Sequence, residues 1–174
     1  MKLVVRRLTR DDAALYRDIR LESLKLHPHA YATTWESSSA LPDEHWATSP
    51  ERMTLFGAFA EDGAVLGLVG YFRSNGDKDR HRGWLVQMYV RETARGSGCA
   101  MALVDAVIAH AETEVLEVHL GVWDKNPGAI RFYEKAGFKV YATDPRAYFW
   151  DGTFYGDHSM VRYLDEAPGR TKND

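Results

Sequence analysis

Two glycines and two arginines form the first group of residues that could do chemistry in this chain. They lie in the stretch Arg91-Glu-Thr-Ala-Arg95-Gly96-Ser97-Gly98-Cys99, between an apolar run and residues with helical spacing. Residues without side chains let backbone N–H groups at a helix N-terminus point outward, and the helix dipole adds positive potential there. The turn is therefore suited to a phosphate-bearing ligand. The alternative is a glycine-rich turn that binds nothing.

Two other phosphate-binding motifs are excluded by single positions. A dinucleotide fingerprint needs a third glycine at position 101, where this chain has Met101. A P-loop needs Gly-Lys-Ser/Thr at the start of the helix, and the stretch after Arg95 contains no such run. Neither of these two phosphate-binding motifs therefore describes the turn.

A second group of residues opens a later helix. Asn126 and Tyr133 are seven residues, or two helical turns, apart, so both side chains project from one helix face. Asn126 can cap this helix, Pro127 suits its first position, and Gly137 suits its C-terminal stop.

Together the two stretches resemble the GNAT superfamily of acetyl-CoA-dependent N-acetyltransferases. Residues 95–100 (Arg-Gly-Ser-Gly-Cys-Ala) fit the family's Arg/Gln-x-x-Gly-x-Gly/Ala signature. The second hallmark of the family is similar to the run formed by Asn126, Ala129, Phe132-Tyr133 and Gly137-Phe138. The two stretches occur in the family's order and at its usual separation.

The resemblance implies an α/β (α+β) fold in a single GNAT-like domain. A mixed, mostly antiparallel sheet of six to seven strands would be flanked by about four helices, with the strands splayed at the acetyl-CoA site. The N-acetyltransferase domain is expected over residues 1–166, and residues 167–174 are expected to form a disordered tail.

The implied activity is direct transfer of an acetyl group from acetyl-CoA, a cosubstrate, to a primary amine, without a metal. Backbone N–H groups of the turn would hold the coenzyme A pyrophosphate, while Arg95 and also Arg91 would offset its charge. The pantetheine arm would pair with the backbone of Met88 and Val90. The cofactor-binding residues implied in this way are Met88, Tyr89, Val90, Arg95, Gly96, Ser97, Gly98, Cys99, Ala100, Asn126 and Tyr133.

Tyr133 is the implied catalytic residue, because the matching tyrosine of the family is proposed to protonate the departing thiolate. Phenol and thiol pKa values of about 10 and 8.5 are close enough for this transfer. The alternative for Tyr133 is a packed aromatic side chain with a satisfied hydroxyl. For Asn126, a helix cap and a contact with the coenzyme arm can hold together.

The general base is not identified by the sequence. Many relatives carry a glutamate on the central strand, whereas this chain has Gln87, which cannot accept a proton. Candidates elsewhere are Glu36, His119 and His158, and an amine that arrives neutral would need no strong base. Cys99, beside the phosphate site, is interpreted as helix packing rather than as a nucleophile.

Substrate contacts are expected from the polar loop 27–41. In the family, the region between the first two helices helps to wall the acceptor pocket, so Tyr31, Trp35 and Glu36 are substrate-binding candidates. Gln87 on the central strand joins them. The alternative is a solvated loop anchored by its two aromatic residues.

Two other functions stay open. One is a non-catalytic acetyl-CoA-binding module, favoured only by the missing carboxylate on the central strand. The other is a transferase for another acyl-CoA, such as a propionyl or succinyl ester. The acceptor amine can belong to a small molecule or to a protein, and homodimers are common in the family.

The elements that must position these residues follow from apolar spacing and from turn residues. In the first helix, Leu15, Ile19 and Leu26 are expected on one stripe, and His27-Pro28 ends the helix. Helices are expected at 13–26, at 42–48, from the glycine turn to about 111, and at 126–136. Strands are expected at 3–5, 53–60, 65–72, 84–90, 115–122, 138–142 and 153–164.

Composition bounds the remaining classes of protein. The 174 residues are 45% hydrophobic and 27% charged, which is typical of one soluble globular domain. A net charge of -3 does not indicate a nucleic-acid partner. The single cysteine excludes an internal disulfide and favours a cytoplasmic location. Because no apolar run approaches the ~18 residues of a membrane span and no signal peptide is apparent, no membrane partner is expected.

Overall fold

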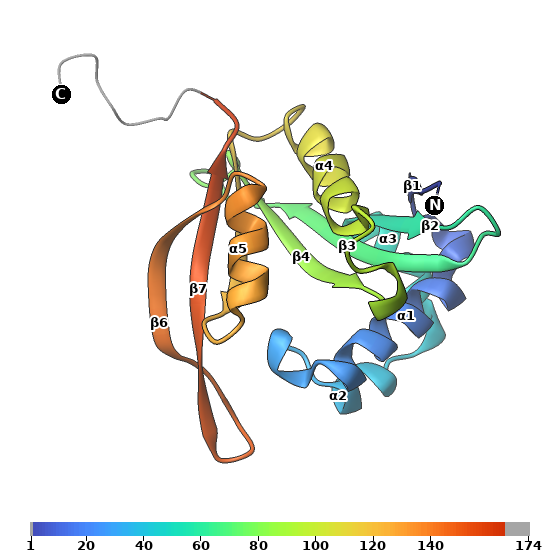
Figure 1. The fold of residues 1–174 in the computed structure, drawn as a ribbon, viewed down its shortest axis with the longest axis horizontal. Coiled ribbons are helices and arrows are strands. Elements are labelled where there is room, and N and C mark those ends of the chain that lie inside the picture. The colour runs from blue at the N-terminus through green and yellow to red at the C-terminus, as the bar shows by residue number, and fades with distance from the viewer. Residues whose placement is uncertain (1, 166–174) are drawn as a thin grey trace. The chain divides into compact units, whose positions relative to one another are not determined.

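The structure, a computed structural model, describes residues 2–165 as a seven-stranded sheet with helices (Figure 1). The strands are β1 (Val4–Arg7), β2 (Thr54–Phe59), β3 (Val65–Arg73), β4 (Arg82–Val90), β5 (Glu117–Trp123), β6 (Lys139–Trp150) and β7 (Thr153–Tyr163). The α-helices are α1 (Ala13–Leu26), α2 (Trp35–Ser39), α3 (Asp43–Arg52), α4 (Cys99–Ala111) and α5 (Pro127–Lys135). The expected tail, residues 167–174, lies outside the described residues, and the domain limits stay a prediction.

The strands pair in the order β1-β2-β3-β4-β5-β7-β6. The pairings of β1 with β2, β2 with β3, β5 with β7 and β6 with β7 are antiparallel, whereas β4 pairs with β5 in parallel. The mixed, mostly antiparallel sheet predicted from the resemblance is therefore confirmed.

The described residues divide into two compact units, 2–72 with 85–107 and 73–84 with 108–165. Strand β4 and helix α4 contribute residues to both units. The parallel pairing of β4 with β5 joins Arg82–Trp84 to Glu117–His119, and all three residue pairs lie in the second unit. The expected splaying of the strands at the coenzyme site stays a prediction.

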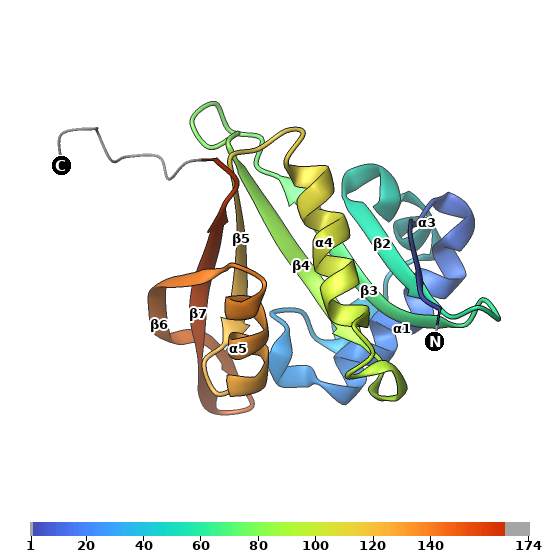
Figure 2. The same cartoon turned by 45° about the horizontal axis from the view of Figure 1, so that its top comes forward.

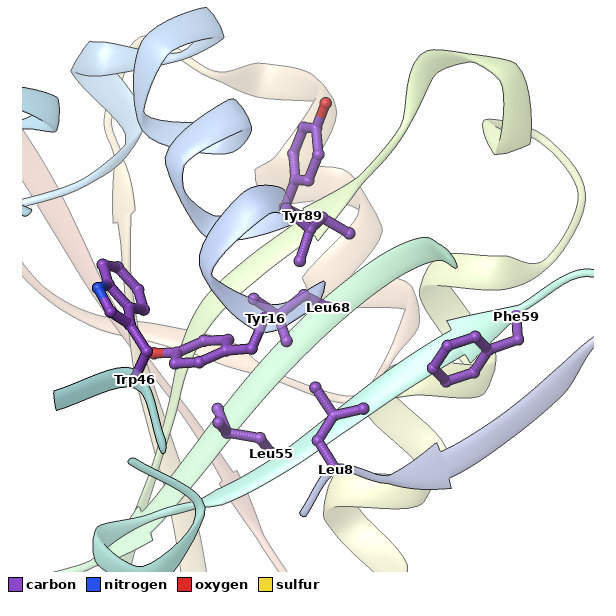
Figure 3. Close-up of a cluster of buried hydrophobic side chains, with 8 residues drawn as sticks. Leu8, Tyr16, Trp46, Leu55, Phe59, Leu68 and Tyr89 are labelled. Carbon is purple, nitrogen blue, oxygen red and sulfur yellow. The ribbon is translucent and has the colours of Figure 1, made fainter. Parts of the chain in front are cut away.

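In the first unit, apolar side chains from α1, α3 and the strands form a core on one face of the sheet (Figure 3). The edge of the Tyr16 ring meets the Trp46 ring, with 5.4 Å between their centroids. Neighbouring strand residues point to opposite faces, so Gly67 faces away from this core. A Cβ at Gly67 would lie 2.9 Å from Leu103 of α4, which shows that α4 packs on the other face. The core cluster comprises Leu8, Tyr16, Ile19, Trp46, Leu55, Phe59, Leu68 and Tyr89.

The limits of α1 were predicted correctly, and its buried stripe was predicted correctly in part, because Ile19 is buried and Leu15 packs against the core. Leu26, predicted on the stripe, is 61% exposed. The buried positions are Tyr16, Ile19, Arg20, Ser23 and Leu24, which follow the i, i+3, i+4 spacing of one helix face. The prediction counted only aliphatic residues and therefore missed the aromatic and polar members of the stripe.

The region predicted as a polar loop, 27–41, contains the short helix α2, so that prediction was wrong in part. The side-chain oxygen of Thr34 accepts a hydrogen bond from the Ser37 amide at 3.2 Å, which caps α2. The next helix, α3, was predicted to end at residue 48 but continues to Arg52, with Pro50 inside it. Proline usually ends a helix, which is why a shorter element was expected.

The second unit places α5 beside the strands β5, β7 and β6 (Figures 1 and 2). Nη1 of Arg162 on β7 donates to the carbonyl of Ala136 at the end of α5, at 2.8 Å. Strand β6 was predicted to end at residue 142 but extends to Trp150. Its exposed residues show no alternation of polar and apolar positions. Alternation is the signal that sequence analysis uses to find a strand, so the extension was missed.

Candidate functional site

The turn before α4 needs its two glycines because of backbone conformation. Gly96 has a φ of +77° and Gly98 has a φ of +86°, both in the left-handed region that other residues rarely adopt. A Cβ built on either glycine would meet nothing within 4 Å. Crowding is therefore not the reason for glycine here, and the space above both residues is open to a ligand.

Backbone N–H groups are presented where α4 begins. The amide of Ala102 donates to the Gly98 carbonyl at 3.0 Å, the first helical bond that reaches back into the turn. The Cys99 amide donates to the Ser97 hydroxyl oxygen at 3.4 Å, and the amides of Ala100 and Met101 belong to the N–H groups that a helix N-terminus leaves for other partners. The Ser97 hydroxyl donates to the Ala94 carbonyl at 2.6 Å and so braces the turn.

The two arginines of the turn have different surroundings. Nη2 of Arg91 lies 2.7 Å from Oε2 of Glu22, and Nη1 of Arg91 donates to the Val65 carbonyl at 2.9 Å. Arg91 is therefore held by protein groups instead of offering a free guanidinium, unlike the expectation. Nη2 of Arg95 lies 3.3 Å from Nε2 of His27 at the surface. Burial, together with the charge of Arg95, lowers the pKa of His27.

Strand β4 is irregular at its centre. Gln87 has a φ of +57°, a left-handed conformation that is uncommon for a residue with a side chain. The Gln87 amide oxygen accepts a hydrogen bond from the Tyr16 hydroxyl at 3.0 Å. The Met88 carbonyl accepts one from the Tyr31 hydroxyl at 2.9 Å. The structure thus brings two predicted substrate residues, Tyr31 and Gln87, to the same segment of β4.

The other two predicted substrate residues lie on α2. Trp35 and Glu36 are both exposed, and Nζ of Lys25 lies 5.7 Å from the centroid of the Trp35 ring. Within the part of the chain that the structure describes, neither residue forms a hydrogen bond or an ion pair with β4. Their part in substrate binding stays a prediction.

Tyr89 of β4 contributes its side chain to the core of the first unit. Its hydroxyl donates to Oε1 of Glu22 at 2.8 Å. Burial, together with this carboxylate, raises the pKa of Tyr89 to about 12. The backbone of Tyr89 is the part that can serve a ligand, because the side chain is engaged.

Asn126 and Tyr133 lie in the second unit on α5. The Asn126 side-chain oxygen accepts from the Ala129 amide at 3.1 Å, so the predicted helix cap is confirmed. Tyr133 is buried, with its ring centroid 5.2 Å from that of Phe132 and 5.8 Å from that of Phe138. Tyr133 is thus held in one position by aromatic contacts.

The histidines considered as bases have partners of their own. Nε2 of His119 lies 2.8 Å from Oε1 of Glu117, and both residues are buried. Although burial raises the pKa of Glu117, hydrogen bonds from His119 and Arg82 hold it below its usual range. Nδ1 of His158 lies 2.8 Å from the Thr143 hydroxyl. Both arrangements connect strands of the second unit.

Two residues with unusual surroundings were missed by the sequence analysis. Arg20 is buried on α1, and its spacing of four residues from Tyr16 was the available signal. Asp157 on β7 is half-buried, and its carboxylate lies so close to Gly121 that a Cβ there would be 2.8 Å from it. Burial raises the pKa of Asp157 to about 6, with the charges of Asp124 and Asp144 adding to the effect. These aspartates lie far apart in sequence, so no local pattern indicates them.

Cys99 is buried at the first position of α4 with 1% of its surface exposed. Burial raises the pKa of this thiol, which keeps it neutral. Its position is that of a packing residue, as expected. Within residues 2–165, no group of three or more His, Cys, Asp or Glu side chains could hold a metal ion. None of the helices described in this range is long and apolar enough to cross a membrane.

Comparison with known proteins adds a family to this geometry. The family model described as "Acetyltransferase (GNAT) family" matches residues 15–138. An uncharacterized N-acetyltransferase of Mycobacterium tuberculosis is 35% identical over 120 residues, which cover 68% of this chain and 72% of that protein. A counterpart from Mycobacterium bovis matches to the same extent.

Solved structures share the fold at low sequence identity. An acetyltransferase of the GNAT family from Streptococcus pneumoniae has a TM-score of 0.79 at 22% identity, covering 94% of this chain and 100% of that one. The structure of yncA from Salmonella typhimurium with its cofactor acetyl-CoA has a TM-score of 0.81 at 20% identity, covering 99% of each chain. These structures bear on the fold alone.

Proposed function

The chain belongs to the GNAT family of acetyltransferases, and from this membership we propose that it acetylates a primary amine by direct transfer from acetyl-CoA. It is an acetyltransferase with acetyl-CoA as its cosubstrate. The nature of the acceptor and the roles of single residues are the proposed part. The observation that carries the proposal is the left-handed pair Gly96 and Gly98 directly in front of the N-terminus of α4.

In the proposed reaction, the amine nitrogen attacks the thioester carbon of acetyl-CoA. A C–N bond forms, the carbonyl oxygen becomes an oxyanion, and the C–S bond breaks as the oxyanion collapses. The amine loses a proton to a base or to water, and the departing coenzyme A thiolate takes up a proton. Catalysis therefore needs a held thioester, a stabilised oxyanion and two proton transfers.

We propose that the turn holds the pyrophosphate of coenzyme A. The amides of Gly96, Gly98 and Ala100 supply N–H groups, the helix dipole adds positive potential, and the exposed Arg95 supplies charge. The Ser97 hydroxyl donates to the Ala94 carbonyl within the turn, and Cys99 is the first, buried residue of α4. Arg91 supports the turn indirectly through its ion pair with Glu22.

The pantetheine arm is proposed to lie along the backbone of Met88, Tyr89 and Val90. The left-handed Gln87 breaks the regular strand just before this segment, which is consistent with backbone groups that turn toward a ligand. Because the Met88 carbonyl already accepts the Tyr31 hydroxyl, a coenzyme group would use its second lone pair.

Tyr133 is proposed as the acid that protonates the thiolate, and Asn126 as a contact of the coenzyme arm. Both roles rest on the similarity of the Asn126–Phe138 run to the second hallmark of the family. The aromatic contacts that hold Tyr133 in place support the role, because a proton donor must be positioned. A cytoplasmic location and a homodimer stay predictions.

The proposal is tested by calorimetry with acetyl-CoA, followed by a thiol-release assay over a panel of primary amines. Expected results are acetyl-CoA binding and turnover with at least one amine. Changing both Gly96 and Gly98 to Ala should weaken acetyl-CoA binding strongly. Gly63→Ala is the matched control, since Gly63 has a φ of +84° and open space around it, but lies in the β2–β3 turn.

Each alternative function has its own outcome in this test. Binding without turnover on any amine would identify a non-catalytic acetyl-CoA-binding module. Faster turnover with propionyl-CoA or succinyl-CoA would identify a transferase for another acyl group. Absence of coenzyme binding, in the wild type as in the double glycine variant, would refute the proposal altogether.

A further inference from the structure

Arg20 is the arginine that the first unit buries most completely among the described residues. It lies on α1, four residues after Tyr16, and only 6% of its surface is exposed. Arginine is almost never buried to this degree unless a partner neutralises its charge. The surroundings of this guanidinium therefore need an explanation.

The protein supplies little to satisfy this side chain. Nη1 of Arg20 lies 3.4 Å from the Ser23 hydroxyl, which itself donates to the Arg20 carbonyl at 2.7 Å. The centroid of the Tyr31 ring lies 4.5 Å from Cζ of Arg20, so the cation faces an aromatic ring. In the part of the chain that the structure describes, no carboxylate lies within ion-pair distance of Arg20.

Other arginines of the same unit show the usual arrangement. Arg6 pairs with Asp12 at 2.7 Å, Arg10 with Glu44 at 2.9 Å, and Arg91 with Glu22 at 2.7 Å. All three are far more exposed than Arg20. The unit thus pairs the arginines that water could solvate and leaves the buried one without an acid.

This arrangement is costly in the absence of a ligand. Burial lowers the pKa of Arg20, because the charged form loses its hydration. The ring of Tyr31 offsets part of that cost, but a guanidinium has five N–H donors, and only one long contact is formed. Within the described residues, Nε and Nη2 of Arg20 form no side-chain hydrogen bond, so these donors are left for an anion.

The position of Arg20 links it to the segment proposed to hold the thioester. Tyr31, which stacks on Arg20, donates to the Met88 carbonyl, and Tyr16, one turn earlier, donates to Gln87. All of these residues lie in the first unit. An anion bound to Arg20 would therefore be separated from the β4 segment by a single side chain, that of Tyr31.

We propose that Arg20 binds the carboxylate of the acceptor, which makes the acceptor a free amino acid or a small amino-acid derivative. This inference rests on the proposed N-acetyltransferase function. The fork of a guanidinium matches the two oxygens of a carboxylate. The side chains that touch Arg20 are neutral, so the site offers one positive charge and suits a carboxylate better than a phosphate dianion.

The first test compares acceptors on the wild-type protein. A thiol-release assay with acetyl-CoA uses free L-amino acids, their C-terminal amides and the corresponding amines without a carboxyl group. The KM for the free acids should be at most about one tenth of the KM for the amides. Acetylation of amides and amines as efficiently as of acids would overturn the role of Arg20 and leave the proposed function standing. Failure of every amine would overturn both.

The second test changes the residue. Arg20→Met should raise the KM for amino acids at least about tenfold while leaving the KM for amides and the acetyl-CoA affinity nearly unchanged. Arg20→Lys keeps the positive charge but lacks the planar fork of the guanidinium. Its KM for amino acids should therefore lie between those of the wild type and of Arg20→Met. Arg10→Met, at a surface ion pair, is the control. An equal loss for acids and amides would show a purely structural role, and the acid-to-amide comparison decides the matter even if Arg20→Met fails to fold.

Discussion

The two roles considered for Tyr133 are a packed aromatic residue and a general acid, and only the second needs its hydroxyl group. The ring is fixed by Phe132 and Phe138, so Tyr133→Phe should keep the packing and remove only the hydroxyl. We expect the rate of thiol release to fall about 100-fold, as is typical when a general acid is lost, with acetyl-CoA affinity unchanged. Tyr163→Phe, at an exposed position of β7, serves as the control. Equal turnover in the two variants would remove Tyr133 from the mechanism.

Asp157 should make the stability of the fold depend on pH. Its pKa is raised to about 6, by burial first and then by Asp124 and Asp144, while His158 acts in the opposite direction. The folded chain therefore holds the proton more tightly than the unfolded chain. The group costs nothing below about pH 4, destabilises the fold progressively as the pH rises from about 4 to 6, and adds no further penalty above that.

Asp157→Asn should therefore stabilise the protein at pH 8 and have no effect near pH 3.5. Two pKa units correspond to roughly 3 kcal/mol for an enclosed group, and partial solvent contact reduces this to about 1 kcal/mol. Urea unfolding at both pH values measures the difference. Asp77→Asn, where the side chain is 98% exposed, should change neither value. A stabilisation that is the same at both pH values would contradict this account.

At the scale of an element, the start of α5 combines a structural and a proposed binding role in Asn126. Its side chain caps the helix through the Ala129 amide. Asn126→Ala should lower the free energy of unfolding by about 1 kcal/mol, whereas Asn126→Ser keeps a capping oxygen and should cost little. If the amide also contacts the coenzyme arm, both variants should lose acetyl-CoA affinity several-fold. Calorimetry that shows full affinity in Asn126→Ser would leave Asn126 as a cap alone.

Elements with strong local signals were predicted well from the sequence. The helix 13–26 has the limits of α1, and the cap, the first-position proline and the terminal glycine located α5 to within one residue at each end. The limits of β6, a strand at the edge of the sheet, were not predicted well. Strand β6 is exposed along its length and contains Asp144-Pro145, which is typical of a turn, so its true extent depends on pairing with β7.

The candidate site was predictable only where its chemistry follows from consecutive residues. The glycine turn of α4 has a local signature, and its left-handed conformations agree with it. The contacts of Gln87 with Tyr16, of Met88 with Tyr31 and of Arg91 with Glu22 join residues from 57 to 71 positions apart. No periodicity in one segment reports such contacts.

For the molecule as a whole, the proposed coenzyme site should appear as a gain in stability. Acetyl-CoA at 100 times its Kd should add about 2.7 kcal/mol to the free energy of unfolding. For a chain of this size, this corresponds to a rise in Tm of about 5–10 °C. S-acetylpantetheine, which lacks the pyrophosphate, should give a much smaller shift in a thermal scan. Equal shifts from the two ligands would contradict the phosphate-binding role of the turn.

Because Cys99 is buried, the rate at which its thiol is labelled reports local opening of the protein. It is the chain's single cysteine, and it lies enclosed and neutral under the first turn of α4. A thiol-reactive dye added to the native protein would therefore score only coenzyme A set free by catalysis. Over longer times, slow labelling of Cys99 would time the moments when the N-terminal end of α4 opens. Acetyl-CoA bound at the turn would make these openings less frequent and so slow the labelling of Cys99.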